Sequence, residues 1–201
     1  MTIAYLALGA NLPSPAGPPD ATLAAALERI SELGRVVVSS SLYSTSPVGY
    51  ADQPRFLNAA AAVETQLGPR DLLDSLLAIE RDFGRDRVGA ILNGPRTLDL
   101  DILLYGDLTV SESGLEIPHP RLAERGFVLI PLNEIAPDAR DPRSGAKVKE
   151  LLLKLRASLP PNLHQTKNEV VAIESDCWRA GRFRAVAGSN NPRANADPHH
   201  G

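Results

Sequence analysis

The chain has few cysteines and few aromatic residues: its 201 residues include one cysteine, Cys177, one tryptophan and four phenylalanines. A single cysteine excludes a disulfide within the chain and a zinc site built from several thiolates. The apolar run at residues 3–8 is too short for a signal peptide or a membrane span, and no basic stretch precedes it. We therefore expect a cytoplasmic protein with no membrane partner.

An excess of positive charge is also missing. The formal net charge of −3 gives no general attraction to nucleic acid. An RNA-binding fold is further disfavoured because aromatic residues do not alternate with basic ones. A Walker-type kinase is excluded because no G-x-x-x-x-G-K-[ST] motif occurs. The length, with 43% hydrophobic and 22% charged residues, fits one globular domain with a core and a tail.

The most informative segment that is present is GPRTLDLDIL, residues 94–103. Apolar and polar residues alternate in it, which predicts a strand. Asp99 and Asp101 would then share one face, about 7 Å apart. Two acids so placed repel each other unless a cation lies between them, and their hard oxygen ligands favour Mg²⁺, which usually accompanies phosphates. The alternative is a solvated strand face, and this segment alone leaves both open.

The remaining pattern predicts alternating strands and helices around this segment. Asp20 is a plausible N-cap of a helix that stops at Gly34, and Pro69 suits the first turn of another helix. The order β-α-β-β-α-β predicts an α+β, ferredoxin-like fold with a mostly antiparallel sheet and helices packed on it. The other expected elements are strands at 3–8, 36–43 and 57–66, a helix at 148–155, an edge strand at 169–174 and an unstructured stretch at 179–201.

Five segments occur together in the order and spacing of one enzyme family. They are AYLALGANL (4–12), YSTSPVGYADQPRFLNAA (43–60), IERDFGRDR (79–87), GPRTLDLDILLYG (94–106) and IPHPRLAERGFVLIPLNEIAP (117–137). In these segments the chain resembles the 6-hydroxymethyl-7,8-dihydropterin pyrophosphokinases of folate biosynthesis. One short motif carries a real false-positive risk, but five in order make chance agreement improbable. We expect a catalytic domain at residues 1–160 and a largely disordered extension at 161–201.

The resemblance implies transfer of the pyrophosphoryl group of ATP to the pterin hydroxymethyl oxygen, with release of AMP. It also implies two Mg²⁺ ions held by Asp99 and Asp101, which agrees with the acid pair on the expected strand. A monomer that acts on small molecules is expected. The alternative is a module of the same fold that binds ATP or pterin without turnover. The intact set of Arg96, Asp99 and Asp101 favours the enzyme.

Arginines are the natural phosphate ligands because their planar, always charged group presents paired donors. The resemblance assigns catalytic roles to Arg85, Arg96 and Asp101. Glu80 is expected on the apolar side of its helix, where a carboxylate needs a partner such as a loop arginine. For the arginines the alternative is a solvated basic loop. The resemblance assigns ATP contacts to Arg85, Arg87, Arg96, Ile102, His119 and Arg125.

A flat, polar pterin needs aromatic faces for stacking and hydrogen-bond partners around its edge. The resemblance places Phe56 and Phe127 on its two faces and Asn58 at its edge, with Thr45 and Val48 supplying main-chain contacts. Plain core packing is the alternative for both phenylalanines.

Overall fold

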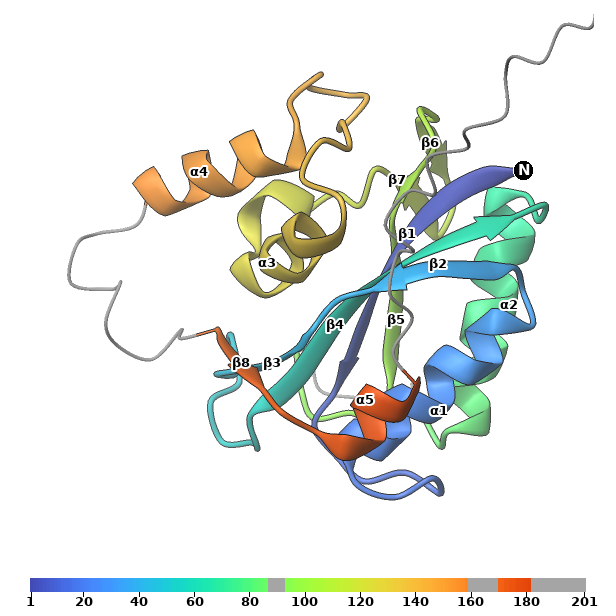
Figure 1. Cartoon of the computed structure of the whole chain (residues 1–201), viewed down its shortest axis with the longest axis vertical. Helices are drawn as coiled ribbons and strands as arrows, with labels where there is room; N and C mark the ends of the chain where they lie inside the picture. The colour runs from blue at the N-terminus through green and yellow to red at the C-terminus, as the bar shows by residue number, and fades with distance from the viewer. Residues whose placement is uncertain (87–92, 159–169, 182–201) are drawn as a thin grey trace, which may run out of the picture.

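A six-stranded antiparallel sheet forms the centre of the computed structural model, which describes residues 1–86, 93–158 and 170–181. The strand order is β5-β1-β4-β3-β8, and β2 pairs with β4 next to β3 (Figure 1). The sequence of elements confirms the predicted ferredoxin-like α+β fold. The strands are β1 (Thr2–Ala10), β2 (Arg35–Ser39), β3 (Leu42–Thr45), β4 (Phe56–Thr65), β5 (Asp99–Tyr105) and β8 (Val171–Ile173), with a separate hairpin of β6 (Val110–Glu112) and β7 (Leu115–Ile117).

Helices cover both faces of this sheet. Helices α1 (Pro19–Ser31) and α2 (Pro69–Asp82) lie on one face, and α3 (Gly126–Ile135) and α4 (Val148–Ser158) on the other (Figure 1). The short helix α5 (Asp176–Gly181) packs against α1. Within the described residues, no helix combines the length and hydrophobicity that a membrane span requires.

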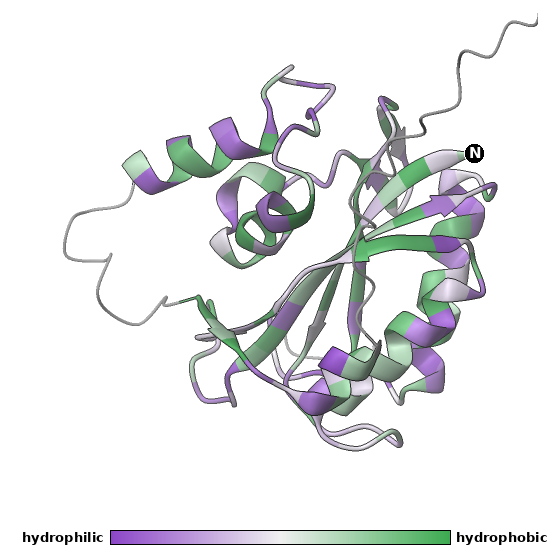
Figure 2. Ribbon diagram, viewed as in Figure 1, coloured by the Kyte–Doolittle hydropathy of each residue, from purple (hydrophilic) through white to green (hydrophobic). Residues whose placement is uncertain are grey.

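The central strands are apolar on both sides because each side meets a helix layer. Leu6 and Leu8 of β1 are buried in the core beneath α1 and α2, whereas Tyr5 and Ala7 pack against the core around α3. Residues 59–63 of β4 accordingly form an unbroken apolar run, as expected for a strand covered on both faces. Figure 2 shows the hydrophobic residues gathered between the layers.

Two of the expected elements differ from the structure. Asp20 is not the N-cap of α1: Pro18 takes that position and Pro19 begins the helix, where a missing N–H costs nothing. The single strand expected at residues 36–43 divides at Ser40. The backbone N–H of Ser40 donates to the carbonyl of Ala60, and the Ser40 hydroxyl oxygen accepts the N–H of Ala60. Because the Ser40 hydroxyl takes the N–H of Ala60 in place of a backbone carbonyl, the regular pairing with β4 is interrupted between β2 and β3.

Other expectations are confirmed. Helix α2 begins at Pro69 and ends just before Gly84, whose φ of 79° only glycine adopts easily. The predicted edge strand is β8, which pairs with β3.

Helix α5 was not predicted, and it includes residues 179–181, for which no structure was expected. The domain boundary at residue 160 stays a prediction, because 159–169 and 182–201 lie outside the described residues.

Candidate active site

The register of the sheet brings the predicted acid strand next to the predicted pterin residue. Gly9 of β1 pairs with Asn58 on one side and with Asp99 on the other. A Cβ atom at Gly9 would lie 3.2 Å from Asn58 Oδ1 and 3.8 Å from Asp99 Cβ. The next position on the same face of β1, Ala7, pairs with Asp101. Small residues of β1 therefore form the floor between the amide and the two carboxylates.

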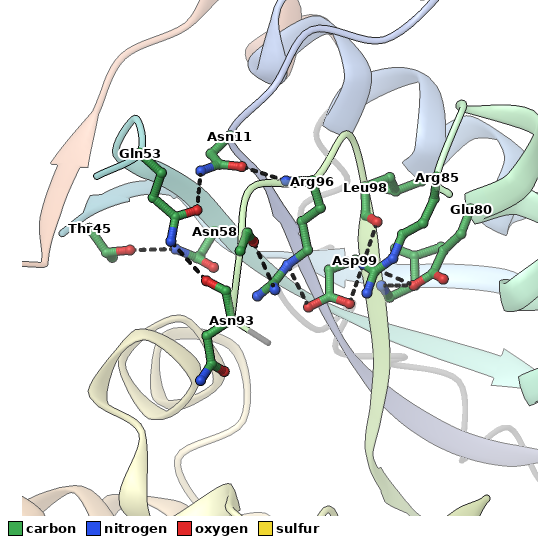
Figure 3. A network of polar contacts seen from close by, with 12 residues as sticks. Asn11, Thr45, Gln53, Asn58, Glu80, Arg85, Asn93, Arg96, Leu98 and Asp99 are labelled. Atoms are coloured by element: carbon green, nitrogen blue, oxygen red, sulfur yellow. Dashed lines mark hydrogen bonds and ion pairs between the residues drawn. The ribbon is translucent and has the colours of Figure 1, made fainter. Parts of the chain in front are cut away.

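Asp99 is held by two of the predicted arginines (Figure 3). Arg85 Nη1 lies 2.5 Å from Asp99 Oδ1 and also donates to the carbonyl of Leu98 at 2.6 Å. Arg96 Nε lies 3.0 Å from Asp99 Oδ2. The Arg85 contact is a charge-assisted hydrogen bond, which is stronger than one between neutral groups, whereas Arg96 contacts Asp99 as an ion pair only. Arg85 and Arg96 are thereby both joined to the first residue of β5.

Glu80 supports this arrangement from α2. Its side chain is 1% exposed, and Oε1 accepts the backbone N–H of Leu100 at 2.8 Å. The same oxygen lies 3.7 Å from Arg85 Nη1. Because β5 is at the edge of the sheet, Glu80 supplies a partner for an N–H that lacks a neighbouring strand on that side.

Asp101 is in a different electrostatic position from Asp99. Burial raises its pKa to about 6, and the charge of Asp99 adds to the increase, while Arg125 and Arg96 oppose it. No other residue of the described part makes a hydrogen bond or an ion pair with its carboxylate. The acid pair thus contains one carboxylate with two arginine partners and one whose charge is not compensated by a direct contact.

The acid pair fits a Mg²⁺ site that is completed by a substrate. Among the described residues, no group of three or more His, Cys, Asp or Glu side chains is arranged to hold a metal. Mg²⁺ is commonly bound through one or two carboxylates together with substrate phosphates and water, so a two-carboxylate set is sufficient. The flanking arginines Arg85, Arg96 and Arg125 suit phosphate oxygens at the same place.

A cavity of about 380 Å³ lies beside the acid pair, a size typical of small-molecule sites. Asn58 Nδ2 donates to Thr45 Oγ1 at 2.8 Å, which orients both polar groups at the cavity wall. Phe56 and Asn58 are each 7% exposed, whereas Val48 is 48% exposed. All five residues predicted to contact the pterin line this cavity, namely Thr45, Val48, Phe56, Asn58 and Phe127.

Each of the two predicted stacking rings carries an arginine. The Arg96 Cζ atom lies 4.8 Å from the centre of the Phe56 ring, and the Arg125 Cζ atom 5.6 Å from that of Phe127. Both distances are within the range of cation–π contacts. Because Arg96 also pairs with Asp99, it connects the cavity to the acid pair.

His119 begins the segment that leads to α3. Its backbone N–H donates to the carbonyl of Leu103 on β5 at 2.9 Å, and its Nδ1 accepts the N–H of Arg121 at 3.0 Å. Burial lowers the pKa of His119 to about 4, with a further contribution from the positive charge of Arg125. Nδ1 is therefore the acceptor of a neutral ring, which leaves the proton on Nε2.

We expect His119 to stay neutral down to about pH 5 and to titrate near pH 4. Because this pKa is below the ordinary value of about 6.5, the folded protein should lose stability as the pH falls from 6.5 to 4. The pH titration of the imidazole signals in nuclear magnetic resonance spectra measures the pKa of His119, and the variant His119→Gln assigns its signal. A His119 titration midpoint near 6.5 would contradict the burial that the structure gives it.

The two remaining predicted ATP contacts are placed differently. Ile102 is 5% exposed and packs in the core beneath α1 and α2, on the opposite face of β5 from Asp101. Its side chain is thus directed away from the cavity. Arg87 lies outside the described residues.

The sequence interpretation missed a polar network that joins three loops (Figure 3). Asn11 Oδ1 accepts the N–H of Arg96 at 2.8 Å, and Asn11 Nδ2 donates to Gln53 Oε1 at 3.0 Å. Gln53 Nε2 in turn donates to the carbonyl of Asn93 at 2.8 Å. The network fixes the backbone that carries Arg96. Asn11 and Gln53 are 42 positions apart, so no local pattern could indicate their contact.

Comparison with known proteins identifies relatives of this chain. The chain is 49% identical over 148 residues to the 2-amino-4-hydroxy-6-hydroxymethyldihydropteridine pyrophosphokinase of Pseudomonas aeruginosa, covering 74% of this chain and 88% of that protein. It is 47% identical over 146 residues to the Haemophilus influenzae protein of the same name, covering 72% and 88%.

Solved structures show the same fold. A Plasmodium falciparum HPPK-DHPS structure matches 86% of this chain with a TM-score of 0.65 at 16% identity. This chain spans about half of that one, 49%. The model of the family described as 7,8-dihydro-6-hydroxymethylpterin-pyrophosphokinase (HPPK) matches residues 5–137. With two thirds of its length matched and with relatives of this similarity, the chain belongs to the 7,8-dihydro-6-hydroxymethylpterin-pyrophosphokinase family.

Proposed function

We propose that the protein transfers the pyrophosphoryl group of ATP to 6-hydroxymethyl-7,8-dihydropterin and releases AMP, as a step of folate synthesis. The observation that carries this proposal is the acid pair, Asp99 and Asp101, directly beside a cavity that fits a small heterocycle. Family membership supports the same reaction. We further expect a cytoplasmic monomer with no nucleic-acid partner.

The cavity accounts for pterin binding. The rings of Phe56 and Phe127 offer apolar faces to a flat heterocycle. Asn58, held by its hydrogen bond to Thr45, has an amide oxygen that can accept from the amino-substituted edge of the ring. Phe56 and Asn58 lie on the same face of β4, so one strand presents both the stacking surface and the edge contact.

The arginines account for the phosphates. Arg85, Arg96 and Arg125 lie around the acid pair, and we propose Arg87 as a fourth phosphate ligand. Among the arginines that the structure describes, Arg96 is well placed to act on the reacting groups, since it lies against both the Phe56 ring and Asp99. The Nε2–H of a neutral His119 can donate to the nucleotide without adding charge.

Asp99 and Asp101 would hold the metal, and we propose two Mg²⁺ ions. When bound, Mg²⁺ would neutralise the triphosphate and orient it for in-line attack by the pterin hydroxyl. The protein then contributes mainly position: β5 keeps the two carboxylates on one face, and Arg85 and Arg96 prevent Asp99 from turning away.

The test is AMP release from ATP by the purified protein, with and without Mg²⁺ and 6-hydroxymethyl-7,8-dihydropterin. We expect AMP only when both are present. AMP formation in EDTA would contradict the metal assignment. Binding of ATP or pterin by calorimetry without AMP release would instead support the non-catalytic module.

A further inference from the structure

Residues 170–181, here called the C-terminal segment, add a strand and a helix beside the cavity. Strand β8 lies along the outer edge of β3, where Val171 pairs with Ser44 and Ile173 with Leu42 (Figure 1). Helix α5 follows and packs on α1. The family match ends at residue 137, so the family's own motifs do not account for this segment.

Trp178 anchors the C-terminal segment to the body of the protein. It is the one tryptophan of the chain, and it is 3% exposed. Its indole Nε1–H donates to the carbonyl of Ser40 at 3.0 Å, which satisfies the polar group of a buried aromatic side chain. Ser175 Oγ accepts the backbone N–H of Trp178 and donates to Asp20 Oδ2 at 2.8 Å. The anchor therefore joins α5 to α1 and to the end of β2.

Ser40, whose carbonyl accepts the hydrogen bond of Trp178, lies just before β3. Ser40 separates β2 from β3 and is bonded to Ala60 of β4 through both its backbone and its hydroxyl. From there β3 runs to Thr45, which accepts the hydrogen bond of Asn58 and lines the cavity. A shift of β3 would therefore move Thr45 and loosen the Asn58 amide.

The C-terminal segment also reaches the cavity directly. Val170, which precedes β8, is one of its lining residues. The acid pair, in contrast, lies on β5 at the opposite end of the strand order from β8. The contacts that the segment makes with the site, through β3 and Val170, are thus on its pterin side.

We propose that the C-terminal segment is part of the pterin-binding site: Val170 is a wall residue, and Trp178 is a positioning residue that holds β3 and Thr45 in the binding-competent arrangement. This proposal rests on the proposed function. It assigns to the segment an effect on pterin affinity and none on the binding of ATP.

The test is calorimetry on the full chain with 6-hydroxymethyl-7,8-dihydropterin and, separately, with Mg²⁺ and ATP. Trp178→Ala removes both the packing and the indole N–H. We expect its pterin Kd to rise about tenfold, as when roughly a tenth of the molecules remain binding-competent, with the ATP Kd within about twofold of wild type. Trp178→Phe keeps most of the packing and should raise the pterin Kd about threefold or less.

Three further variants make the outcome decisive. Cys177→Ser changes an exposed residue of the same helix and should leave both Kd values unchanged. Phe127→Ala removes a proposed stacking ring and should weaken pterin binding irrespective of the segment. Val170→Asp places a charge in the cavity wall without touching the anchor and should weaken pterin binding even if Trp178→Ala fails to fold.

An unchanged pterin Kd in folded Trp178→Ala, or an equal loss of ATP and pterin binding, would overturn the proposal. If Phe127→Ala weakens pterin binding while the Trp178 and Val170 variants do not, the proposal fails and the proposed function stands. If the wild-type chain neither binds pterin nor forms AMP, both fail.

Discussion

Replacing Asp101 with asparagine should reduce AMP formation by at least about 100-fold, because it removes one of the two charges that we propose to hold the metal beside the phosphates. The same substitution should stabilise the protein in EDTA. The folded state keeps the pKa of Asp101 near 6, above its ordinary value of about 3.8, through burial and the charge of Asp99. The ionised carboxylate therefore destabilises the metal-free fold at neutral pH.

The sign of the pH dependence follows from linkage. Because folding raises this pKa, the wild-type protein should lose stability relative to Asp101→Asn as the pH rises from about 4 to 6. Thermal unfolding in EDTA at several pH values measures the difference, and an AMP assay on the same samples measures the rate. Asp107→Asn, at an exposed position just beyond β5, is the matched control. Near-wild-type AMP formation by Asp101→Asn would refute the role given to this carboxylate.

Replacing Glu80 with alanine should destabilise the protein by about 3 kcal/mol, which lowers Tm by about 6–12 °C for a chain of this size. The change leaves the buried N–H of Leu100 without an acceptor and takes one carboxylate away from Arg85. Activity should fall as well, since Arg85 and the start of β5 lose a fixed support. Differential scanning calorimetry gives the loss of stability.

The variant Glu80→Gln separates the hydrogen bond to Leu100 from the charge beside Arg85. The amide oxygen can still accept from Leu100, so most of the stability should return, while the charge beside Arg85 is lost. Asp74→Ala, at an exposed position of the same helix, should change the free energy of unfolding by less than about 0.5 kcal/mol. A loss in Glu80→Ala no larger than that of the Asp74 variant would contradict the support that Glu80 gives to β5.

Local patterns predicted the parts of the fold that local physics decides. The alternation in residues 98–103 gave β5 and its acid face correctly, and Pro69 marked the start of α2. Asp20 was misassigned because Pro19 is a favourable first residue of a helix. With Pro19 as the first helical residue, the N-cap is the residue before it, Pro18. Helix α5 was missed because only Trp178 is buried in it, so no apolar periodicity exists.

The charged residues of the candidate site were predictable from the sequence, but the strand pairings that position them were not. Arg96 and Asp99 belong to one continuous motif, so their proximity follows from the chain itself, whereas Arg85 lies in a separate segment. The approach of Asn58 to Asp99 depends on the register of two separate pairings with β1, and the strand predicted at residues 3–8 ended before Gly9. A glycine inside a strand can signal a close approach, but it does not identify the neighbours.

The pairing pattern of β1 has a consequence for how the chain folds as it is synthesised. This strand is made first, yet its two partners are β4, residues 56–65, and β5, residues 99–105. Closing such long loops costs entropy before any contact is formed, so β1 cannot have both of its partners until residue 105 has left the ribosome. Until then β1 has an open, strongly apolar edge, which is the kind of surface that aggregates or recruits chaperones. The β8 edge of the sheet forms later still, so a nascent chain can place the acid pair on β5 before Val170 closes the wall of the cavity.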